Sequence, residues 1–346
     1  MKIAILSPFE ESVPPVKYGG TELVVYNLIE ELVKLGHEVT LLGTGNSRTS
    51  AKLVTIFEKP LRSCVESNTR EIYKIVGISK IVSILAKNKY DIIHNHIGWR
   101  FLPFSKALNT PVVTTLHGPL SIPLQQEIYE IWKKENYISI SLSQQRPMPS
   151  LNYVGNVYNG IDFTKFHLFK KPNDYFAFLG RMSPEKGPKE AIEVAKKAGV
   201  RLIMAAKVDL VDRQYFENKV KPLIDGKQIK FVGEVDHPGK LELLGKAKAL
   251  IAPIQWEEPF GLYFIESLAC GTPVIALKRG SVPEILIDEK NGFICENLAQ
   301  MCLATKKISS IDRKFCHDHA KENFNSTKMA SNYLKCYKKV LNSSRI

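Results

Sequence analysis

Hydrophobic residues in the first half of the chain follow two alternating spacings. Residues 2–6 (KIAIL) form an unbroken apolar run, which is typical of a strand buried on both faces. Val24, Leu28, Leu32 and Leu35 instead recur at helical spacing, and a glycine follows them as a helix stop. The pattern predicts strands at 2–6, 37–42, 91–94 and 111–116, and helices at 21–35, 78–88 and 124–135. Such alternation indicates βαβ units and a parallel sheet.

The alternation of strand and helix patterns is interrupted near residues 150–170 and then resumes. Residues 153–162 are rich in Gly and Asn, so we expect turns there. Beyond them, the pattern predicts strands at 175–179, 201–205, 229–232, 249–252 and 273–277, helices at 188–198 and 261–270, and a mostly helical stretch at 305–340. The prediction is an α/β protein with two doubly wound, Rossmann-like domains, 1–160 and 161–326, that face each other across a cleft.

Composition narrows the class of protein. The chain has 346 residues, more than one ordinary core accommodates, and its 44% hydrophobic and 24% charged residues argue against disorder. No apolar run approaches the roughly 20 residues that span a bilayer, and the N-terminus lacks the apolar region of a signal peptide. Six cysteines without a CxxC pair are expected to be reduced and structural. We therefore expect a cytoplasmic protein.

Positive charge is concentrated near the C-terminus. The net charge is +13, and residues 305–346 hold ten Lys and Arg against three Asp and Glu. This surplus favours an anionic partner, although a solvated basic helix explains it as well. No interleaved aromatic residues accompany the charge, so we expect no nucleic-acid partner. Reversible docking on the anionic inner face of a membrane is a further hypothesis, with residues 75–89 as either an amphipathic contact or a helix packed in the core.

A pair of glutamates marks the most informative stretch, residues 258–276. Glu258 and Glu266 are separated by seven residues, and the segment that carries Glu266 is predicted to be helical. Carboxylates accept hydrogen bonds from sugar hydroxyls, and free N–H groups at a helix start bind anions. The N–H groups concerned are those of Phe260, Gly261 and Leu262. A ligand with both hydroxyls and phosphates fits this layout, which points to a nucleotide sugar.

Two further motifs have the chemistry of phosphate binding. Gly19 and Gly20 precede the first predicted helix, where backbone can approach a phosphate, although a tight loop with Thr21 as the N-cap is an alternative. Arg181 and Lys186 follow a predicted strand and could clamp a diphosphate from two sides; two surface cations beside a turn are the alternative. The sequence has neither a GxGxxG fingerprint nor a P-loop.

Histidines lie at the ends of two predicted strands. His117 is expected to face the cleft, where it would orient a sugar or touch a phosphate; an ordinary loop histidine is the alternative. His94 and His96 form an H-x-H pair with no evident third ligand, so we expect no bound metal and no cofactor. The sequence contains no Asp-x-Asp pair, which weakens any metal–diphosphate mechanism.

Taken together, these motifs resemble the retaining family 4 glycosyltransferases of the GT-B fold. Residues 258–266 (EPFGLYFIE) match the E-x7-E motif of the family, and residues 180–187 look like its diphosphate clamp. Residues 18–21 look like its glycine loop, and 159–162 are similar to the turn that leads into the second domain. The resemblance covers nearly the whole chain, and it is the order of the motifs that makes it specific.

The resemblance implies a role for each candidate residue. Arg181 and Lys186 would neutralise the departing diphosphate, Glu258 and His117 would lie beside the donor sugar, and Glu266 would hold the ribose hydroxyls. The remaining residues would offer backbone groups to sugar, phosphate or acceptor: Gly19, Gly20, Phe260, Gly261 and Leu262. Residues 327–346 would form a helix that crosses back to brace the first, acceptor-side domain, while 161–326 would bind the donor.

The implied function is retaining transfer of a hexose from a nucleotide-diphosphate sugar, with UDP favoured by family frequency alone, to an acceptor hydroxyl. The family needs no bound metal, and we expect a glycan or lipid-linked acceptor in the biosynthesis of a cell-surface glycan or glycolipid. Two alternatives stay open: a nucleotide-sugar epimerase or phosphorylase on the same fold, and a non-catalytic binding module that uses the basic tail.

Overall fold

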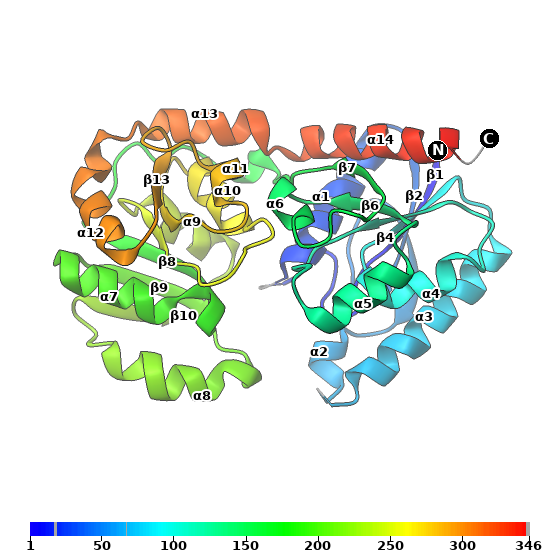
Figure 1. The fold of residues 1–346 in the computed structure, drawn as a ribbon, viewed down its shortest axis with the longest axis horizontal. Helices are drawn as coiled ribbons and strands as arrows, with labels where there is room; N and C mark the ends of the chain where they lie inside the picture. The colour runs from blue at the N-terminus through cyan, green and yellow to red at the C-terminus, as the bar shows by residue number, and fades with distance from the viewer. Residues whose placement is uncertain (17–18, 67, 344–346) are drawn as a thin grey trace. The chain divides into compact units, whose positions relative to one another are not determined.

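The computed structural model describes residues 1–16, 19–66 and 68–343, which form two compact α/β units (Figure 1). Unit 1 comprises residues 1–160 together with α14 (Ser326–Ser343), and unit 2 comprises residues 161–325. Each unit contains one parallel sheet with helices. The predicted fold class, two doubly wound α/β domains, is confirmed.

Unit 1 is built on a seven-stranded parallel sheet with the order β3-β2-β1-β4-β5-β6-β7. Its strands are β1 (Lys2–Leu6), β2 (Glu38–Thr44), β3 (Lys52–Phe57), β4 (Ile92–Asn95), β5 (Val112–Thr115), β6 (Asn136–Ser139) and β7 (Tyr153–Asn156). Its other helices are α1 (Gly20–Lys34), α2 (Leu61–Cys64), α3 (Arg70–Lys87), α4 (Leu102–Ser105), α5 (Pro123–Ile131) and α6 (Leu142–Gln145), with a 3₁₀ turn at Gly98–Phe101. The strand order reverses between β1 and β4, so ligands are expected at the carboxyl ends of these strands.

Unit 2 is built on a six-stranded parallel sheet with the order β10-β9-β8-β11-β12-β13. Its strands are β8 (Phe176–Arg181), β9 (Leu202–Lys207), β10 (Ile229–Gly233), β11 (Leu250–Ala252), β12 (Val274–Leu277) and β13 (Gly292–Cys295). Its helices are α7 (Pro188–Ala198), α8 (Arg213–Tyr215), α9 (His237–Gly245), α10 (Leu262–Ala269), α11 (Val282–Ile285), α12 (Leu298–Lys307) and α13 (Arg313–Asn323). Its 3₁₀ turns are Phe163–Lys165, Pro184–Lys186, Leu210–Asp212, Lys221–Leu223 and Ile308–Ser310, and Phe216–Val220 is a π turn. Here the order reverses between β8 and β11.

Burial explains why these segments adopt these elements. The apolar residues of β1, Ile3 to Leu6, are completely buried, as expected for a central parallel strand that is covered on both faces. In α1, the residues at helical spacing form the buried face: Val24, Val25, Leu28, Ile29 and Leu32. The alternation of apolar runs and apolar helical stripes therefore predicts both the parallel sheet and the helices that cover it.

The prediction of turns at residues 153–162 is wrong for the first four, because Tyr153–Asn156 forms the edge strand β7. Its glycine has a packing role and does not mark a turn. A Cβ atom on Gly155 would lie 2.4 Å from Sγ of Cys336 on α14, so only glycine allows this helix to approach the strand. A glycine that permits close packing cannot be distinguished from a turn glycine by composition.

Two helical predictions also change in detail. The stretch 305–340 is divided among α12, α13 and α14, because a 3₁₀ turn follows Lys307 and Asp312 caps a new helix through the N–H of Lys314. Residues 75–89 belong largely to α3, whose buried positions Ile78, Ile81 and Leu85 pack in the core of unit 1, while Ile75 and Val76 are exposed. No helix in the described part of the chain is long and apolar enough to cross a membrane.

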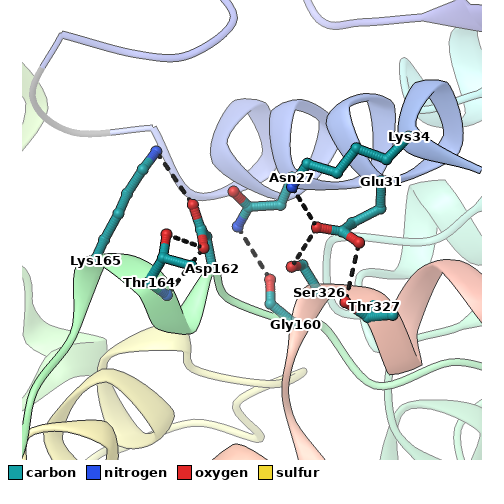
Figure 2. Close-up of polar contacts among 9 residues, drawn as sticks. All are labelled: Asn27, Glu31, Lys34, Gly160, Asp162, Thr164, Lys165, Ser326 and Thr327. Atoms are coloured by element: carbon teal, nitrogen blue, oxygen red, sulfur yellow. Dashed lines mark hydrogen bonds and ion pairs between the residues drawn. The ribbon is translucent and has the colours of Figure 1, made fainter.

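Helix α1 holds both segments where the chain leaves and re-enters unit 1 (Figure 2). The Asn27 side chain donates to the carbonyl of Gly160 at 3.1 Å. One turn later, Glu31 accepts from Oγ of Ser326 at 3.2 Å and from Oγ1 of Thr327 at 2.9 Å. Asn27 and Glu31 are four residues apart and lie on the same helix face, so one helix anchors both ends of the connection.

Candidate functional site

In unit 2, the loop that carries Glu258 connects β11 to α10 and is held by the loop that follows β12. The N–H of Ser281 donates to the Glu258 carbonyl at 2.9 Å, and the Ser281 hydroxyl donates to the Phe260 carbonyl at 2.6 Å. The N–H of Gly280 donates to the Glu257 carboxylate at 2.7 Å. Gly280 has φ of +54°, and a Cβ atom there would lie 2.4 Å from the Glu258 backbone nitrogen, so only glycine fits. The Glu258 backbone is thus fixed by neighbouring backbone.

Three donors converge on the Glu258 side chain, which is 6% exposed. Its Oε2 atom accepts from Nε1 of Trp256 at 3.1 Å and from Oη of Tyr263 at 3.2 Å, and it is paired with the Lys186 ammonium. The same ammonium lies 5.1 Å from the ring centroid of Trp256 and 5.1 Å from that of Tyr263. Four side chains therefore hold a cation and an anion in one partly buried cluster.

The start of α10 adjoins this cluster. Gly261 caps the helix with φ of +81°, and no side chain caps it. Within the described residues, no hydrogen bond is recorded for the N–H groups of Gly261 and Leu262. The Phe260 side chain is 2% exposed and contacts Phe324, so it anchors the loop in the core of unit 2. A helix start with free N–H groups beside a lysine is suited to an anion.

Arg181, at the end of β8, is held by two carboxylates. Its side chain pairs with Glu185, four residues later, and its Nε atom lies 2.9 Å from Oδ2 of Asp212. Burial raises the pKa of Asp212, and the Arg181 guanidinium opposes this shift. The arrangement fixes the orientation of the guanidinium, which is 30% exposed, and partly offsets its charge.

The 3₁₀ turn that carries Lys186 ends at Gly187, which is the N-cap of α7. Gly187 has φ of +71°, and a Cβ atom there would lie 2.1 Å from the Pro253 carbonyl oxygen. Pro253 directly follows β11. The loop that carries Lys186 and the loop that leads to Glu258 therefore meet backbone to backbone at Gly187. This close approach brings Lys186 and Glu258 together although they are 72 positions apart.

Glu266 lies in α10, which is buried on all sides from Phe264 to Ala269, and Glu266 itself is 4% exposed. Its carboxylate is paired with Lys240 of α9, whose side chain is 18% exposed. A buried carboxylate with a single cationic partner keeps further lone pairs for hydroxyl donors. Glu266 thus fits a role in binding hydroxyl groups.

In unit 1, Gly19 lies between β1 and α1 and Gly20 is the first residue of α1, whereas Tyr18 of the same motif lies outside the described residues. Helix α1 begins at Gly20 with Gly19 as the N-cap and no side-chain cap, so Thr21 is inside the helix and is not its cap. A Cβ atom on Gly19 would lie 2.6 Å from Cβ of Pro15 and 3.2 Å from Oε2 of Glu22. Burial raises the pKa of Glu22 to about 7.

His117 follows β5 and adjoins two other histidines of unit 1. Its Nε2 atom lies 2.8 Å from Nδ1 of His96, and Nε2 of His96 lies 3.2 Å from Nδ1 of His94. Burial lowers the pKa of all three rings, to about 4 in the case of His117. Among the residues that the structure describes, no group of three or more His, Cys, Asp or Glu side chains is arranged to hold a metal ion.

The structure thus brings together Lys186, Glu258, Gly261 and Leu262 in unit 2, with Arg181 and Glu266 on neighbouring elements of the same unit. Gly19, Gly20 and His117 belong to unit 1. Several residues of these clusters are not among the predicted site residues: Glu22, His96, Trp256, Tyr263, Asp212 and Lys240. Trp256 precedes the glutamate motif and Tyr263 lies within it, so both could have been suspected. Asp212 and Lys240 come from segments without a recognisable pattern.

Comparisons with known proteins assign both halves of the chain to one class. Residues 161–322 match the family described as glycosyl transferases group 1, and residues 18–145 match glycosyltransferase family 4. A curated relative, glycogen synthase of Mycobacterium tuberculosis, is 23% identical over 85% of this chain and 83% of its own length.

Solved structures agree in fold. Sucrose-phosphate synthase of Thermosynechococcus elongatus has a TM-score of 0.82 at 19% identity, covering 99% of both chains. Anabaena HepE, solved in complex with UDP-glucose, has a TM-score of 0.72 at 19% identity, covering 99% of this chain and all of that one.

Proposed function

We propose the following function for this chain, which belongs to the group 1 glycosyltransferases of the family 4 type, with the GT-B fold. It moves a hexose from a nucleotide-diphosphate sugar, UDP-linked by preference, to the hydroxyl group of a glycan or lipid-linked acceptor, with retention of anomeric configuration and without a metal. The observation that carries this proposal is the cluster of Lys186, Glu258, Trp256 and Tyr263 beside the open start of α10.

The cluster supports a diphosphate as the leaving group. The Lys186 ammonium has three hydrogen-bond donors, of which Glu258 takes one, so donors remain for a phosphate oxygen. The N–H groups of Gly261 and Leu262 and the positive end of the α10 dipole add to the same field. Arg181 would contribute a second cation, already oriented by Glu185 and Asp212. These groups are fixed before charge develops, which is the condition for stabilising a transition state.

The proposed step balances without a protein nucleophile. The bond between the anomeric carbon and the diphosphate oxygen breaks, and its electron pair leaves with the diphosphate. The acceptor oxygen then forms a bond to that carbon on the same face, and its proton passes to the departing phosphate. Glu258 and His117 would contact the donor sugar, and Glu266 would accept hydrogen bonds from the ribose hydroxyls.

Titration calorimetry with UDP, GDP and ADP, in buffer containing a chelator, tests the donor site. We expect one of them to bind, and Glu266→Ala to lose that binding. Absence of binding by all three nucleotides would overturn the proposal. Analysis of products with the matching nucleotide sugar then separates transfer or hydrolysis from release of an epimerised nucleotide sugar.

Measurements of turnover test the roles of Lys186 and Arg181. Lys186→Ala and Arg181→Ala are each expected to lose on the order of 10²–10³ in kcat, because cations at the leaving group act where charge develops. Lys196→Ala is a matched control, since Lys196 is an exposed lysine of α7 in the same unit. Near-normal turnover in the Lys186 variant would remove this lysine from the mechanism.

We also propose reversible docking on an anionic membrane face, consistent with a lipid-linked acceptor. Its support is the charge of residues 305–346 together with the exposed apolar residues Ile72, Ile75 and Val76 of α3. Sedimentation with vesicles of phosphatidylcholine, with and without phosphatidylglycerol, tests it. Binding only to the anionic vesicles is expected, and no binding to either would overturn this part.

A further inference from the structure

A continuous line of polar contacts runs through the core of unit 1, from helix α14 to His117. Tyr337 Oη lies 2.6 Å from Nδ1 of His94, and Nε2 of His94 lies 2.7 Å from Oγ1 of Thr115. The line continues from His94 to His96 at 3.2 Å and from His96 to His117 at 2.8 Å. His94, His96 and Thr115 are at most 3% exposed, so no bulk water competes for these bonds.

The hydroxyl group of Thr115 determines which atom donates and which accepts along the whole line. The Thr115 hydroxyl donates its single hydrogen to Oη of Tyr333 at 3.3 Å, so toward His94 it can only accept. His94 therefore carries its hydrogen on Nε2 and offers a lone pair at Nδ1. The Tyr337 hydroxyl donates to that lone pair, and His96 must share it by donating from Nε2, because an unprotonated His96 Nε2 would set a lone pair against it; this leaves Nδ1 of His96 as the acceptor for the Nε2 hydrogen of His117.

This assignment requires that each ring is neutral and holds one hydrogen. Burial lowers the pKa of His94 and His96 well below the usual value, and that of His117 to about 4, so all three are neutral at pH 7. With neutral rings, the opposite orientation of His96 would set two lone pairs against each other across its 3.2 Å contact with His94. One arrangement of hydrogens therefore satisfies every contact.

We propose that His94 and His96 are positioning residues that hold His117 in one tautomer, with hydrogen on Nε2 and a bare lone pair on Nδ1. Among the described residues, no partner is recorded for His117 Nδ1. A bare lone pair accepts a hydrogen bond from a hydroxyl group and repels a phosphate oxygen. The sequence leaves open whether His117 serves a sugar or a phosphate; the hydrogen-bond direction selects a sugar hydroxyl, which rests on the proposed function.

The line also gives α14 a part in the site. Tyr333 and Tyr337 are four residues apart on this helix, both are fully buried, and each contacts the polar line. They lie more than 200 positions from the histidines along the chain. Helix α14 thus fixes the hydrogen positions of a residue that is distant from it in the sequence of unit 1.

NMR of the full-length protein with ¹⁵N-labelled histidine tests the proposal without any substrate. At pH 7 we expect His117, assigned by the loss of its signals in His117→Gln, to show a single tautomer with a protonated Nε2 and an unprotonated Nδ1. Scalar coupling across the hydrogen bond should connect Nε2 of His117 to Nδ1 of His96. A protonated Nδ1 on His117, or no coupling between the two rings, would overturn the proposal.

Substitution at His96 separates positioning from packing. The Gln side chain of His96→Gln can accept from His117 through its oxygen and donate to His94 through its nitrogen, so we expect it to keep the His117 tautomer. His96→Leu removes both bonds and should give averaged nitrogen shifts at His117. His37→Gln, a histidine of unit 1 outside the line, is the matched control and should change neither. Identical His117 shifts in the Leu variant and in the wild type would contradict the positioning role.

Activity provides an independent measurement. If His117 serves the donor sugar, His96→Leu should lower kcat/KM for the nucleotide sugar by about tenfold. Binding of the free nucleotide should stay unchanged, and His96→Gln should restore most of the loss. Equal losses in donor turnover and in nucleotide binding would point to general damage. If transfer is absent while the ring-to-ring coupling is present, the proposed function fails and the hydrogen-bond line stands.

Discussion

Glu22 of unit 1 is a buried carboxyl group whose pKa departs from that of an ordinary glutamate. It lies in the first turn of α1 and is 6% exposed, close to the glycine loop. Burial raises its pKa to about 7, with a smaller contribution from the nearby carboxylates of Glu10 and Glu11. The folded protein therefore binds more protons than the unfolded chain between pH 4.5 and 7, so stability from this group falls as pH rises through that window.

Replacing Glu22 should remove this loss of folding stability at higher pH. We expect Glu22→Gln to be as stable as the wild type at pH 4 and more stable by up to about 3 kcal/mol at pH 8. Urea unfolding at both pH values measures the difference. Glu38→Gln is the control, because that side chain is 74% exposed and should change stability little. A Glu22→Gln variant with no advantage at pH 8 would contradict the raised pKa.

At the residue scale, the sequence identifies the site residues that belong to a motif. It does not identify the residues that form ion pairs with them. Glu258 and Lys186 stand out because their neighbours suggest phosphate and sugar chemistry. Lys240 and Asp212, which pair with Glu266 and Arg181, come from segments with no such context. Their positions depend on how α9 and the turn before α8 pack, and this information is spread over the fold.

At the element scale, the two ends of α7 provide a matched pair of glycines. Gly187 caps its start with φ of +71° and Gly199 caps its end with φ of +68°. A Cβ atom on Gly199 meets nothing within 4 Å, whereas one on Gly187 would lie 2.1 Å from the Pro253 carbonyl oxygen. The two positions carry similar backbone strain and differ in the space available.

Alanine at these positions should separate strain from close approach. We expect Gly199→Ala to cost about 1 kcal/mol of unfolding free energy, the usual penalty of a left-handed residue with a Cβ atom. Gly187→Ala should cost at least about 3 kcal/mol and should also weaken nucleotide binding, because the loop that carries Lys186 must move. Urea unfolding and calorimetry measure the two effects. Equal costs at both positions would show that the contact with Pro253 does not matter.

Helix α1 supports a second prediction at this scale. Glu31→Ala removes the acceptor of Ser326 and Thr327 at the start of α14, so we expect unit 1 to lose about 2 kcal/mol. Lys34→Ala, whose exposed ammonium also bonds Glu31, should cost less than about 1 kcal/mol. Urea unfolding followed by the fluorescence of Trp99 and Trp132 reports on unit 1 in a Trp256→Phe background. Similar losses in both variants would contradict the anchoring role of Glu31.

Elements with a clear apolar pattern could be predicted closely, whereas several short strands could not. The predicted helix 188–198 has the bounds of α7, and the predicted strand 2–6 has those of β1. The strands β3, β6, β7 and β13 have no counterpart in the prediction. Each has four to six residues, and their burial comes from neighbours in the sheet. In β7, the glycine that suggests a turn serves the approach of α14.

For the whole molecule, both units share one topological feature, a reversal of strand order, but the residues beside it differ in charge. Each sheet reverses its strand order once, and some residues of the candidate clusters follow the strands on either side of that point. In unit 2 these residues are charged: Arg181 ends β8, and Glu258 follows β11. In unit 1 they are neutral: Gly19 follows β1, and His96 follows β4. This division fits a phosphate-bearing ligand on unit 2 and hydroxyl groups on unit 1.

The neutral histidines of unit 1 should make that unit sensitive to acid. His94, His96 and His117 contact one another, Thr115 and the tyrosines of α14, and their pKa values are lowered by burial. The unfolded chain therefore binds more protons than the folded one below about pH 6.5, so stability falls as pH drops from there toward 4. Each histidine contributes a slope of about 1.4 kcal/mol per pH unit, and Glu22 opposes them with one proton.

The slope can be assigned to the histidines by removing one of them. Urea unfolding between pH 5 and 6.5, followed through Trp99 and Trp132 in the Trp256→Phe background, should show His96→Gln to be less acid-sensitive than the wild type by about 1.4 kcal/mol per pH unit. His167→Gln, an exposed histidine of unit 2, should leave the slope of unit 1 unchanged. If the His96 variant keeps the wild-type slope, His96 is already charged in the folded protein, and the single arrangement of hydrogens that fixes His117 cannot hold.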